Sequence, residues 1–165
     1  MARRTGSCAD EQVDPPIRNT RQMMYPEPMV APMREELTRL GVQELRTAAD
    51  VAEALGNAKG TALVVVNSVC GCSARNARPA VEAALQHAVK PDQLYTVFAG
   101  QDVDATKAAR AFFTGYPPSS PSIALLKDGR IVTMLERHQI EGRTASEVAQ
   151  DLVTAFDRHC AASVA

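Results

Sequence analysis

The clearest hydrophobic pattern in the chain is an unbroken apolar run near its middle. Leu63–Val66 are all apolar, three of them are β-branched valines, and the polar residues Asn67 and Ser68 follow. A short run of this kind is typical of a strand that is buried on both faces of a sheet. The segment from Ser73 to Leu85 is rich in alanine, which favours a helix. The pattern therefore predicts a buried strand that leads, within a few residues, into a helix.

Turn residues, helix caps and apolar spacing predict further elements on both sides of this strand. These elements are a helix Pro32–Leu40, a strand Val42–Leu45, a helix Thr47–Leu55, a strand Leu94–Ala99, a helix Asp104–Phe113, paired strands Ser122–Lys127 and Arg130–Leu135, a loop Glu136–Arg143 and a helix Thr144–Cys160. Strands joined by helices pair in parallel through right-handed crossovers, whereas the Asp128-Gly129 turn predicts an antiparallel hairpin. We therefore predict an α/β fold, a three-layer α/β/α sandwich around a mixed sheet with a C-terminal antiparallel hairpin. This is the arrangement of a thioredoxin-like domain, here with an extra N-terminal helix.

Residues 1–24 lack the apolar spacing of the rest of the chain. They contain Arg3-Arg4, Cys8 and Pro15-Pro16, but no apolar segment of the kind that follows the basic start of a signal peptide. We therefore expect a flexible tail over residues 1–24, a domain over residues 25–165 and a cytoplasmic location. Cys8 is either a regulatory thiol or an incidental exposed cysteine, and we expect the second.

Composition and charge argue against several classes of protein. The formal net charge of -1 gives no reason to expect nucleic acid or an anionic membrane as a partner. No apolar run has the length of a membrane-spanning helix, and four cysteines are too few for a secreted disulfide scaffold. Because there is no tryptophan and aromatic residues make up only 4% of the chain, the core must be aliphatic.

The candidate chemistry lies at the predicted junction of strand and helix, in Cys70-Gly71-Cys72. Backbone N–H groups and the positive end of the helix dipole gather at a helix N-terminus, and both favour a thiolate over a thiol. We expect Arg75 and Arg78 to add positive charge. Gly71 permits the backbone angles that a disulfide across so short a spacing requires, and such a disulfide should be strained and easily reduced. The alternative is that both cysteines are small buried hydrophobic residues.

The pattern also predicts roles for the two thiols. Thiol–disulfide exchange needs a thiolate that attacks a disulfide sulfur and a second thiol that releases the mixed disulfide. By analogy with Cys-X-X-Cys proteins, Cys70 at the strand end is the expected nucleophile and Cys72 the resolving thiol, with the reversed assignment left open. This chemistry requires no metal and no organic group bound to the protein.

The sequence resembles the bacilliredoxins, small thioredoxin-like proteins with a Cys-Gly-Cys active site. The resemblance extends from Tyr25 to the last helix and is carried by the following segments: Tyr25-Pro26, Val64–Asn67, Val69–Pro79, Phe98–Asp102 and Gly115–Ser122. It implies removal of bacillithiol, the co-substrate, from mixed disulfides on oxidised cytoplasmic proteins. Some members are described as disulfide isomerases, so isomerisation by the same dithiol is an alternative function. The tail with Cys8 has no counterpart in the resemblance.

The loop before the hairpin resembles the place where thioredoxins carry a cis-proline beside the redox pair. Pro121, preceded by Ser120, is the residue in register. Because proline lacks an N–H group, neighbouring backbone groups stay available to pair with an extended substrate. Gly71, Ser120 and Pro121 are therefore the expected substrate-binding residues, and the isomer of Pro121 is open at this point.

Two functions of other classes compete with redox chemistry. A metal-binding module would combine the two thiols with candidates among His87, His138, His159 and Cys160, although none has the spacing of a zinc site. A scaffold that only binds partners would have lost one cysteine of the pair, yet both are present. Cys160 follows Phe156 on one face of the last helix and is expected to pack as a small hydrophobic residue.

Overall fold

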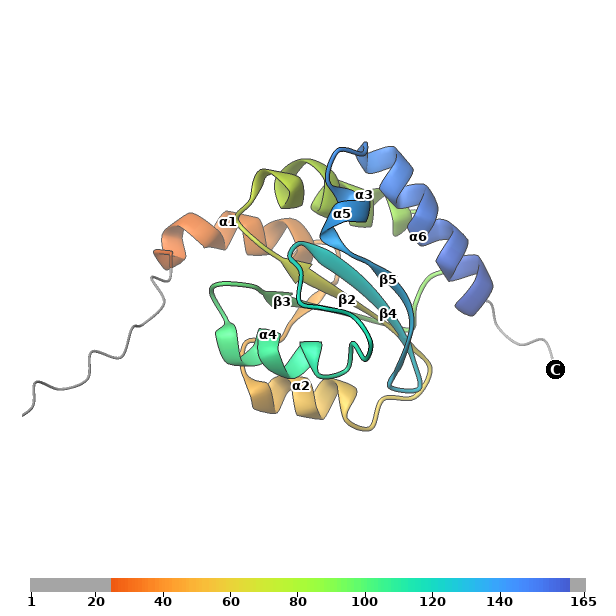
Figure 1. Cartoon of the computed structure of the whole chain (residues 1–165), viewed down its shortest axis with the longest axis horizontal. Helices are drawn as coiled ribbons and strands as arrows, with labels where there is room; N and C mark the ends of the chain where they lie inside the picture. Colours follow the sequence, from red (N-terminus) through yellow and green to blue (C-terminus); the bar gives the residue numbers. More distant parts are fainter. Residues whose placement is uncertain (1–24, 161–165) are drawn as a thin grey trace, which may run out of the picture.

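The computed structural model describes residues 25–160, which form a five-stranded mixed sheet covered by helices (Figure 1). The strands are β1 Gln43–Glu44, β2 Thr61–Asn67, β3 Gln93–Phe98, β4 Ser122–Lys127 and β5 Arg130–Leu135, in the order β1-β3-β2-β4-β5. β1 and β2 are parallel to β3, whereas β4 is antiparallel to both β2 and β5. The predicted mixed sheet with an antiparallel hairpin at one edge is therefore confirmed.

β2 lies in the middle of the sheet, and all seven of its residues are buried. Successive side chains of a strand point to opposite faces. Accordingly, Leu63 and Val65 pack into one apolar cluster, while Val64 and Val66 pack into the other. Burial on both faces explains why the run contains no polar alternation.

Helices cover both faces of the sheet and give the predicted three layers (Figure 1). The cluster around Leu63 includes residues of α1, α3 and α6, and the cluster around Val64 includes residues of α2 and α4. The helices are α1 Glu27–Thr38, α2 Ala48–Leu55, the π-helical segment η1 Ser73–Ala77, α3 Arg78–Ala84, α4 Val103–Arg110, α5 Arg137–Ile140 and α6 Ala145–His159. The predicted capping boxes at Thr47 and Thr144 both form.

The first helix begins earlier than predicted. It starts at Glu27, and Pro32, expected in the first turn, lies inside it. The reason is a set of long-range ion pairs that the local pattern does not contain. The buried Arg34 guanidinium pairs with Glu27 at 2.8 Å and with Asp102 at 2.6 Å, and it stacks over the ring of Phe98. These contacts hold the first turn of α1 although Pro32 lacks an N–H group to donate within the helix.

Other boundaries also differ from the predictions. α4 spans Val103–Arg110 instead of the predicted Asp104–Phe113, and its N-cap residue Asp102 pairs with Arg34 and makes no cap hydrogen bond. The predicted loop Glu136–Arg143 contains the short helix α5. A capping box between Glu136 and Gln139 starts this helix, and its last residue, Ile140, is fully buried. Tertiary packing therefore adds order where the apolar spacing indicated none.

Candidate active site

The two thiols follow the carboxyl end of β2 and precede η1. Cys70 and Cys72 are free thiols, and both are half-buried. The backbone N–H groups of Ser73 and Ala74 donate to the carbonyl of Cys70 at 3.1 and 3.2 Å, which fixes the start of the helical segment. The structure thus brings the predicted redox pair together at the end of the buried strand.

The helix after the thiols is π-helical rather than α-helical in its first part. The N–H group of Arg78 donates to the carbonyl of Ser73, five residues earlier. Pro79 lies in the first turn of α3 and cannot donate to the carbonyl of Arg75. This missing hydrogen bond accounts for the local change of helix type, and Pro79 begins a new segment instead of kinking a continuous helix.

A group of hydrogen-bonded side chains lies beneath the thiols; we call Asn67, Ser68, Ser73 and Arg78 the polar network. All four residues are buried. Asn67 Oδ1 accepts hydrogen bonds of 2.9 Å from the Ser68 N–H group, the Ser73 hydroxyl and Arg78 Nη1. Arg78 also donates to the Ser68 carbonyl at 3.1 Å and pairs with Glu36. Every member is satisfied by another, so the network holds Ser68 in one position.

Ser68 connects the polar network to Cys70. Its hydroxyl oxygen lies 3.1 Å from Cys70 Sγ, where it can donate to the thiolate. Burial raises the pKa of Cys70, but the hydrogen bond from Ser68 lowers it. Further lowering comes from the N–H groups of Ser73 and Cys72 and from the charge of Arg137, so the pKa of Cys70 falls below its ordinary value.

Cys72 differs from Cys70 in the direction of its pKa shift. Burial raises the pKa of Cys72, and the negative charges of Glu141 and of the Cys70 thiolate raise it further. Arg137 opposes these effects but does not overcome them. At neutral pH the thiolate therefore forms preferentially on Cys70, which is the property that a nucleophilic thiol needs.

The positive charge near Cys70 comes from a different residue than predicted. Arg75 is exposed, and Arg78 is buried with its guanidinium in the polar network. The arginine whose charge lowers the pKa of Cys70 is Arg137, in the first turn of α5. Sequence reasoning missed it because α5 was predicted as a loop, and no local signal connects that segment to Cys70.

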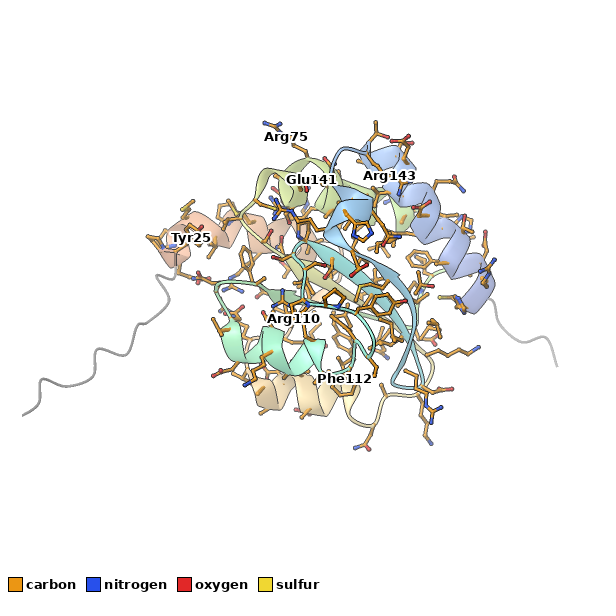
Figure 2. All side chains as sticks on the ribbon, in the orientation of Figure 1. Tyr25, Arg75, Arg110, Phe112, Glu141 and Arg143 are labelled. Carbon is orange, nitrogen blue, oxygen red and sulfur yellow. The ribbon has the colours of Figure 1, made fainter. Side chains whose placement is uncertain are left out.

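The predicted cis-proline loop is connected to this site by hydrogen bonds from Arg137. The Ser120–Pro121 peptide bond is cis, and Pro121 is buried. Arg137 donates from its backbone N–H to the Ser119 hydroxyl and from Nη1 to the Ser120 carbonyl, both at 3.4 Å. On the other side of the loop, Arg110 donates to the Ser119 carbonyl at 3.2 Å (Figure 2). The substrate-binding role of Ser120 and Pro121 stays a prediction.

Gly71 is not required by the backbone of the dithiol form. Its φ angle lies outside the left-handed region, and a Cβ atom added there would meet nothing within 4 Å. The expected need for glycine concerned the closed disulfide, which is a different state, and stays a prediction. In the dithiol form Gly71 is exposed, so a side chain at this position would meet open space.

The other cysteines lie apart from this pair. Cys160 caps the end of α6 and packs, half-buried, against the apolar cluster around Leu63, as predicted for a small hydrophobic residue. Figure 1 places the end of α6 far from the junction of β2 and η1. Cys8 and the predicted tail lie outside the described residues.

The part of the chain that the structure describes contains no group of three or more His, Cys, Asp or Glu side chains placed to hold a metal ion. The metal-binding alternative therefore lacks a ligand set among residues 25–160. Among the helices described in this range, none is long and apolar enough to cross a membrane.

Comparisons with known sequences match nearly the whole described range. A family model described as "Disulphide isomerase" matches residues 25–160. A bacilliredoxin of Koribacter versatilis is 55% identical over 140 residues, which cover 85% of this chain and 97% of the relative. A bacilliredoxin of Symbiobacterium thermophilum is 61% identical over 123 residues, covering 74% of this chain and 87% of the relative.

Comparisons with solved structures agree on the fold. The thioredoxin of Malassezia sympodialis superposes with a TM-score of 0.50 at 15% identity, covering 73% of this chain and 91% of that one. The thioredoxin-like domain of Arabidopsis NCP gives a TM-score of 0.50 at 18% identity, covering 74% and 81%. With the sequence relatives, this likeness establishes that the chain belongs to the bacilliredoxin family and is a thiol–disulfide oxidoreductase with a thioredoxin-like fold.

Proposed function

We propose that this protein removes bacillithiol from mixed disulfides on cytoplasmic proteins, with Cys70 as the nucleophile and Cys72 as the resolving thiol. The bacilliredoxin relatives support bacillithiol as the small thiol, and the observation that carries the two roles is the opposite direction of the pKa shifts of two thiols at one strand end. A lowered pKa supplies the attacking thiolate on Cys70 at neutral pH. A raised pKa keeps Cys72 protonated until the first step is complete.

The proposed reaction has two exchange steps. In the first, the Cys70 thiolate attacks the bacillithiol sulfur, a Cys70–bacillithiol disulfide forms, and the substrate protein leaves as a thiolate that takes a proton from water. In the second, Cys72 loses its proton and attacks Cys70 Sγ, which expels bacillithiol as a thiolate and leaves a Cys70–Cys72 disulfide. The mixed disulfide is thereby reduced by two electrons and the dithiol is oxidised by two. A thiol reductant then restores the dithiol.

Cys70 loses its negative charge in the first step, and this loss makes it easier for Cys72 to lose its proton in the second. Once Cys70 is in a disulfide, neither its negative charge nor its hydrogen bond raises the pKa of Cys72, and only burial and the charge of Glu141 still hold Cys72 protonated. The Ser68 hydroxyl is then free to stabilise the charge that returns to Cys70 Sγ when the Cys70–Cys72 disulfide is later reduced. No step needs a bound metal or organic cofactor.

The protein half of the substrate is proposed to lie along Ser120 and Pro121. In support, hydrogen bonds tie this loop to Arg137, whose charge lowers the pKa of Cys70. An extended substrate segment can pair with exposed backbone groups of such a loop, because proline contributes no competing donor. Gly71 leaves room for the substrate disulfide to reach Cys70.

Disulfide isomerisation by the same dithiol is the second candidate, and the description of the matching family model favours it. In an isomerase, Cys70 attacks a non-native disulfide and the released thiolate attacks elsewhere in the same substrate, so the dithiol finishes reduced. The two functions therefore differ in whether Cys72 completes the second step.

The experiment compares three substrates at equal concentration: a bacillithiolated protein, the same protein glutathionylated, and a protein with scrambled disulfides. We expect the bacillithiolated substrate to have the highest kcat/KM and the oxidised Cys70–Cys72 form to accumulate in single turnover. Equal turnover of the two mixed disulfides would remove the specificity for bacillithiol. Faster turnover of the scrambled protein, without oxidation of the dithiol, would make isomerisation the function.

A further inference from the structure

A hollow of about 410 Å³ opens beside the dithiol. Its lining residues come from the start of the helical segment after β2 and from α5 with the loop behind it: Cys70, Gly71, Cys72, Arg75, Asn76, Arg137, Gly142 and Arg143. This volume is within the range of small-molecule sites in proteins. A molecule in the hollow would therefore be small and would lie directly against the redox pair.

The two walls of the hollow are fixed to each other by Asn76. Its amide group donates to the carbonyl of Ile140 at 2.8 Å and to the carbonyl of Arg143 at 2.6 Å. These bonds tie η1 to the end of α5 and to the loop that follows. The hollow is thus held open by a side chain in its own wall, which favours a formed site over a transient gap.

Three arginines line the hollow, and two of them already have carboxylate partners. Arg143 Nη1 lies 2.6 Å from Asp151 and also donates to the Gln139 carbonyl. Arg137 Nε lies 3.3 Å from Glu141. Figure 2 shows Arg75, Glu141 and Arg143 at the same end of the molecule.

Arg75 is the arginine that lacks such a partner. It is exposed and makes neither an ion pair nor a side-chain hydrogen bond with any residue in the described range 25–160. Figure 2 shows its side chain extending from the ribbon into solvent. Its guanidinium is a flexible fork of donors on a long stem, suited to a carboxylate, and no carboxylate of residues 25–160 is paired with it.

We propose that this hollow binds the small-thiol half of the mixed disulfide, that this small thiol is a carboxylate anion, and that Arg75 pairs with its carboxylate. The inference rests on the proposed function and adds to it the charge and the place of the small thiol. Seated there, the small thiol presents its own sulfur to Cys70, whereas the protein half lies toward Ser120. Arg75 acts as a specificity-determining residue and takes no part in bond making.

The geometry also explains which sulfur is attacked. A mixed disulfide offers two sulfurs, and attack on the protein sulfur would leave the substrate covalently attached to Cys70. Binding of the anionic half between Arg75 and Arg137 directs the small-thiol sulfur to Cys70 instead. The Cys70 thiolate then forms a bond to the small thiol, and the electron pair of the broken S–S bond leaves on the substrate protein.

The test uses one carrier peptide with a single cysteine, joined in turn to 3-mercaptopropionate, 2-mercaptoethanol and cysteamine. These thiols are similar in size and are anionic, neutral and cationic. The kcat/KM of the full-length protein is compared with that of Arg75→Ala for each substrate, because this ratio cancels differences in intrinsic reactivity. Arg39→Ala is the matched control, since Arg39 is an exposed arginine outside the hollow.

We expect Arg75→Ala to lower kcat/KM about three- to fivefold for the anionic substrate, to leave the neutral one unchanged and to raise the cationic one by less than about twofold. Arg75→Lys should restore part of the loss, and the Cys70 thiolate absorbance profile should not move. Equal losses on all three substrates, or none on the anionic one, would overturn the subsite. In a second arm, bacillithiolated and glutathionylated carriers are compared. Equal rates there, with the charge dependence on Arg75 intact, would count against the proposed function but not against the subsite.

Discussion

The surroundings of the dithiol divide into two regions that act on it in different ways. Beneath the thiols, the polar network is buried and each member is hydrogen-bonded to another. Above them, Arg137 and Glu141 are exposed charges on α5 and just after it. Buried hydrogen bonds are barely screened by water or salt, whereas exposed charges are screened strongly. The hydrogen bond from Ser68 lowers the pKa of Cys70 more than the charge of Arg137 does, so we expect the buried region to have the larger effect on the reactivity of Cys70.

The largest effects should come from the thiols themselves. Cys70→Ser should abolish exchange, because the thiolate stabilised by the polar network is lost. Cys72→Ser should still attack, but it should accumulate a mixed disulfide on Cys70. Mass spectrometry of both variants after reaction with a mixed-disulfide protein locates the adduct. An adduct on Cys72 with turnover retained in Cys70→Ser would reverse the two roles.

Ser68→Ala tests the buried region. The variant removes the hydroxyl that donates to Cys70, so the pKa of Cys70 should rise and the thiolate fraction at neutral pH should fall. We expect kcat/KM about five- to tenfold lower at pH 7. Because the deficit comes from a raised pKa, it should vanish at a pH above the Cys70 pKa of both the variant and the unchanged protein, where Cys70 is a thiolate in each.

Thiolate absorbance against pH gives the two pKa values, and the rate profile should follow them. Ser146→Ala, an exposed serine in the first turn of α6, serves as the control. A deficit that persists at high pH would mean that Ser68 acts through structure rather than through ionisation of Cys70.

Arg137→Ala tests the exposed region. Loss of its charge should also raise the pKa of Cys70, but the group is exposed and paired with Glu141. We expect a decrease in exchange rate of about two- to threefold at low salt, which fades as ionic strength rises. The deficit of Ser68→Ala relative to the unchanged protein should show no such salt dependence, because Arg137 is present in both. If the two variants responded alike to salt, the division into two regions would be wrong.

Glu141→Gln should have a smaller effect, and it should speed up the reaction instead of slowing it. Because Glu141 raises the pKa of Cys72, its neutralisation should lower that pKa and increase the thiolate fraction available for the second step. We expect release of the small thiol to speed up by at most about twofold, with the first step unchanged. Single-turnover kinetics separate the two steps, and Glu53→Gln on the opposite face of the sheet is the control. A slower second step would contradict the assigned sign.

The smallest effect, none, is expected when the chain starts at Tyr25 and carries Cys160→Ser. Both thiols and their polar network lie in the remaining residues, and Cys160 lies at the end of α6, far from the junction of β2 and η1. The exchange rate and the Cys70–Cys72 disulfide should be retained. Turnover lost from a folded protein would make Cys8 or Cys160 a third participant in the redox chemistry.

The sequence predicted those parts of the molecule whose signals are local. The apolar run of β2, the Asp128-Gly129 hairpin and the capping boxes of α2 and α6 all depend on residues close together in the chain. The same holds for Cys70 and Cys72, which a strand end and a helix start bring together.

Features that depend on distant partners were missed. α1 begins early because Arg34 pairs with Asp102, and α5, although a local capping box starts it, is held by the burial of Ile140 in the core. Arg137 affects Cys70 only through this packing. Ser68 lies two residues before Cys70, but Asn67 and Arg78 hold its backbone in place, and composition or spacing does not reveal such a network.

The π-helical segment η1 separates two demands that one continuous helix would have to meet together. In an α-helix each residue turns the side-chain direction by about 100°. In one continuous α-helix, the direction of Arg78 relative to Ser73 would therefore also fix the direction of the core residues that follow. The five-residue hydrogen bond from Arg78 to Ser73 inserts an angular offset between them. Arg78 therefore faces the polar network while Ala80, Val81 and Ala84 face the core. The direction of the side chains around the thiols is therefore set separately from the rotation of α3 on the sheet.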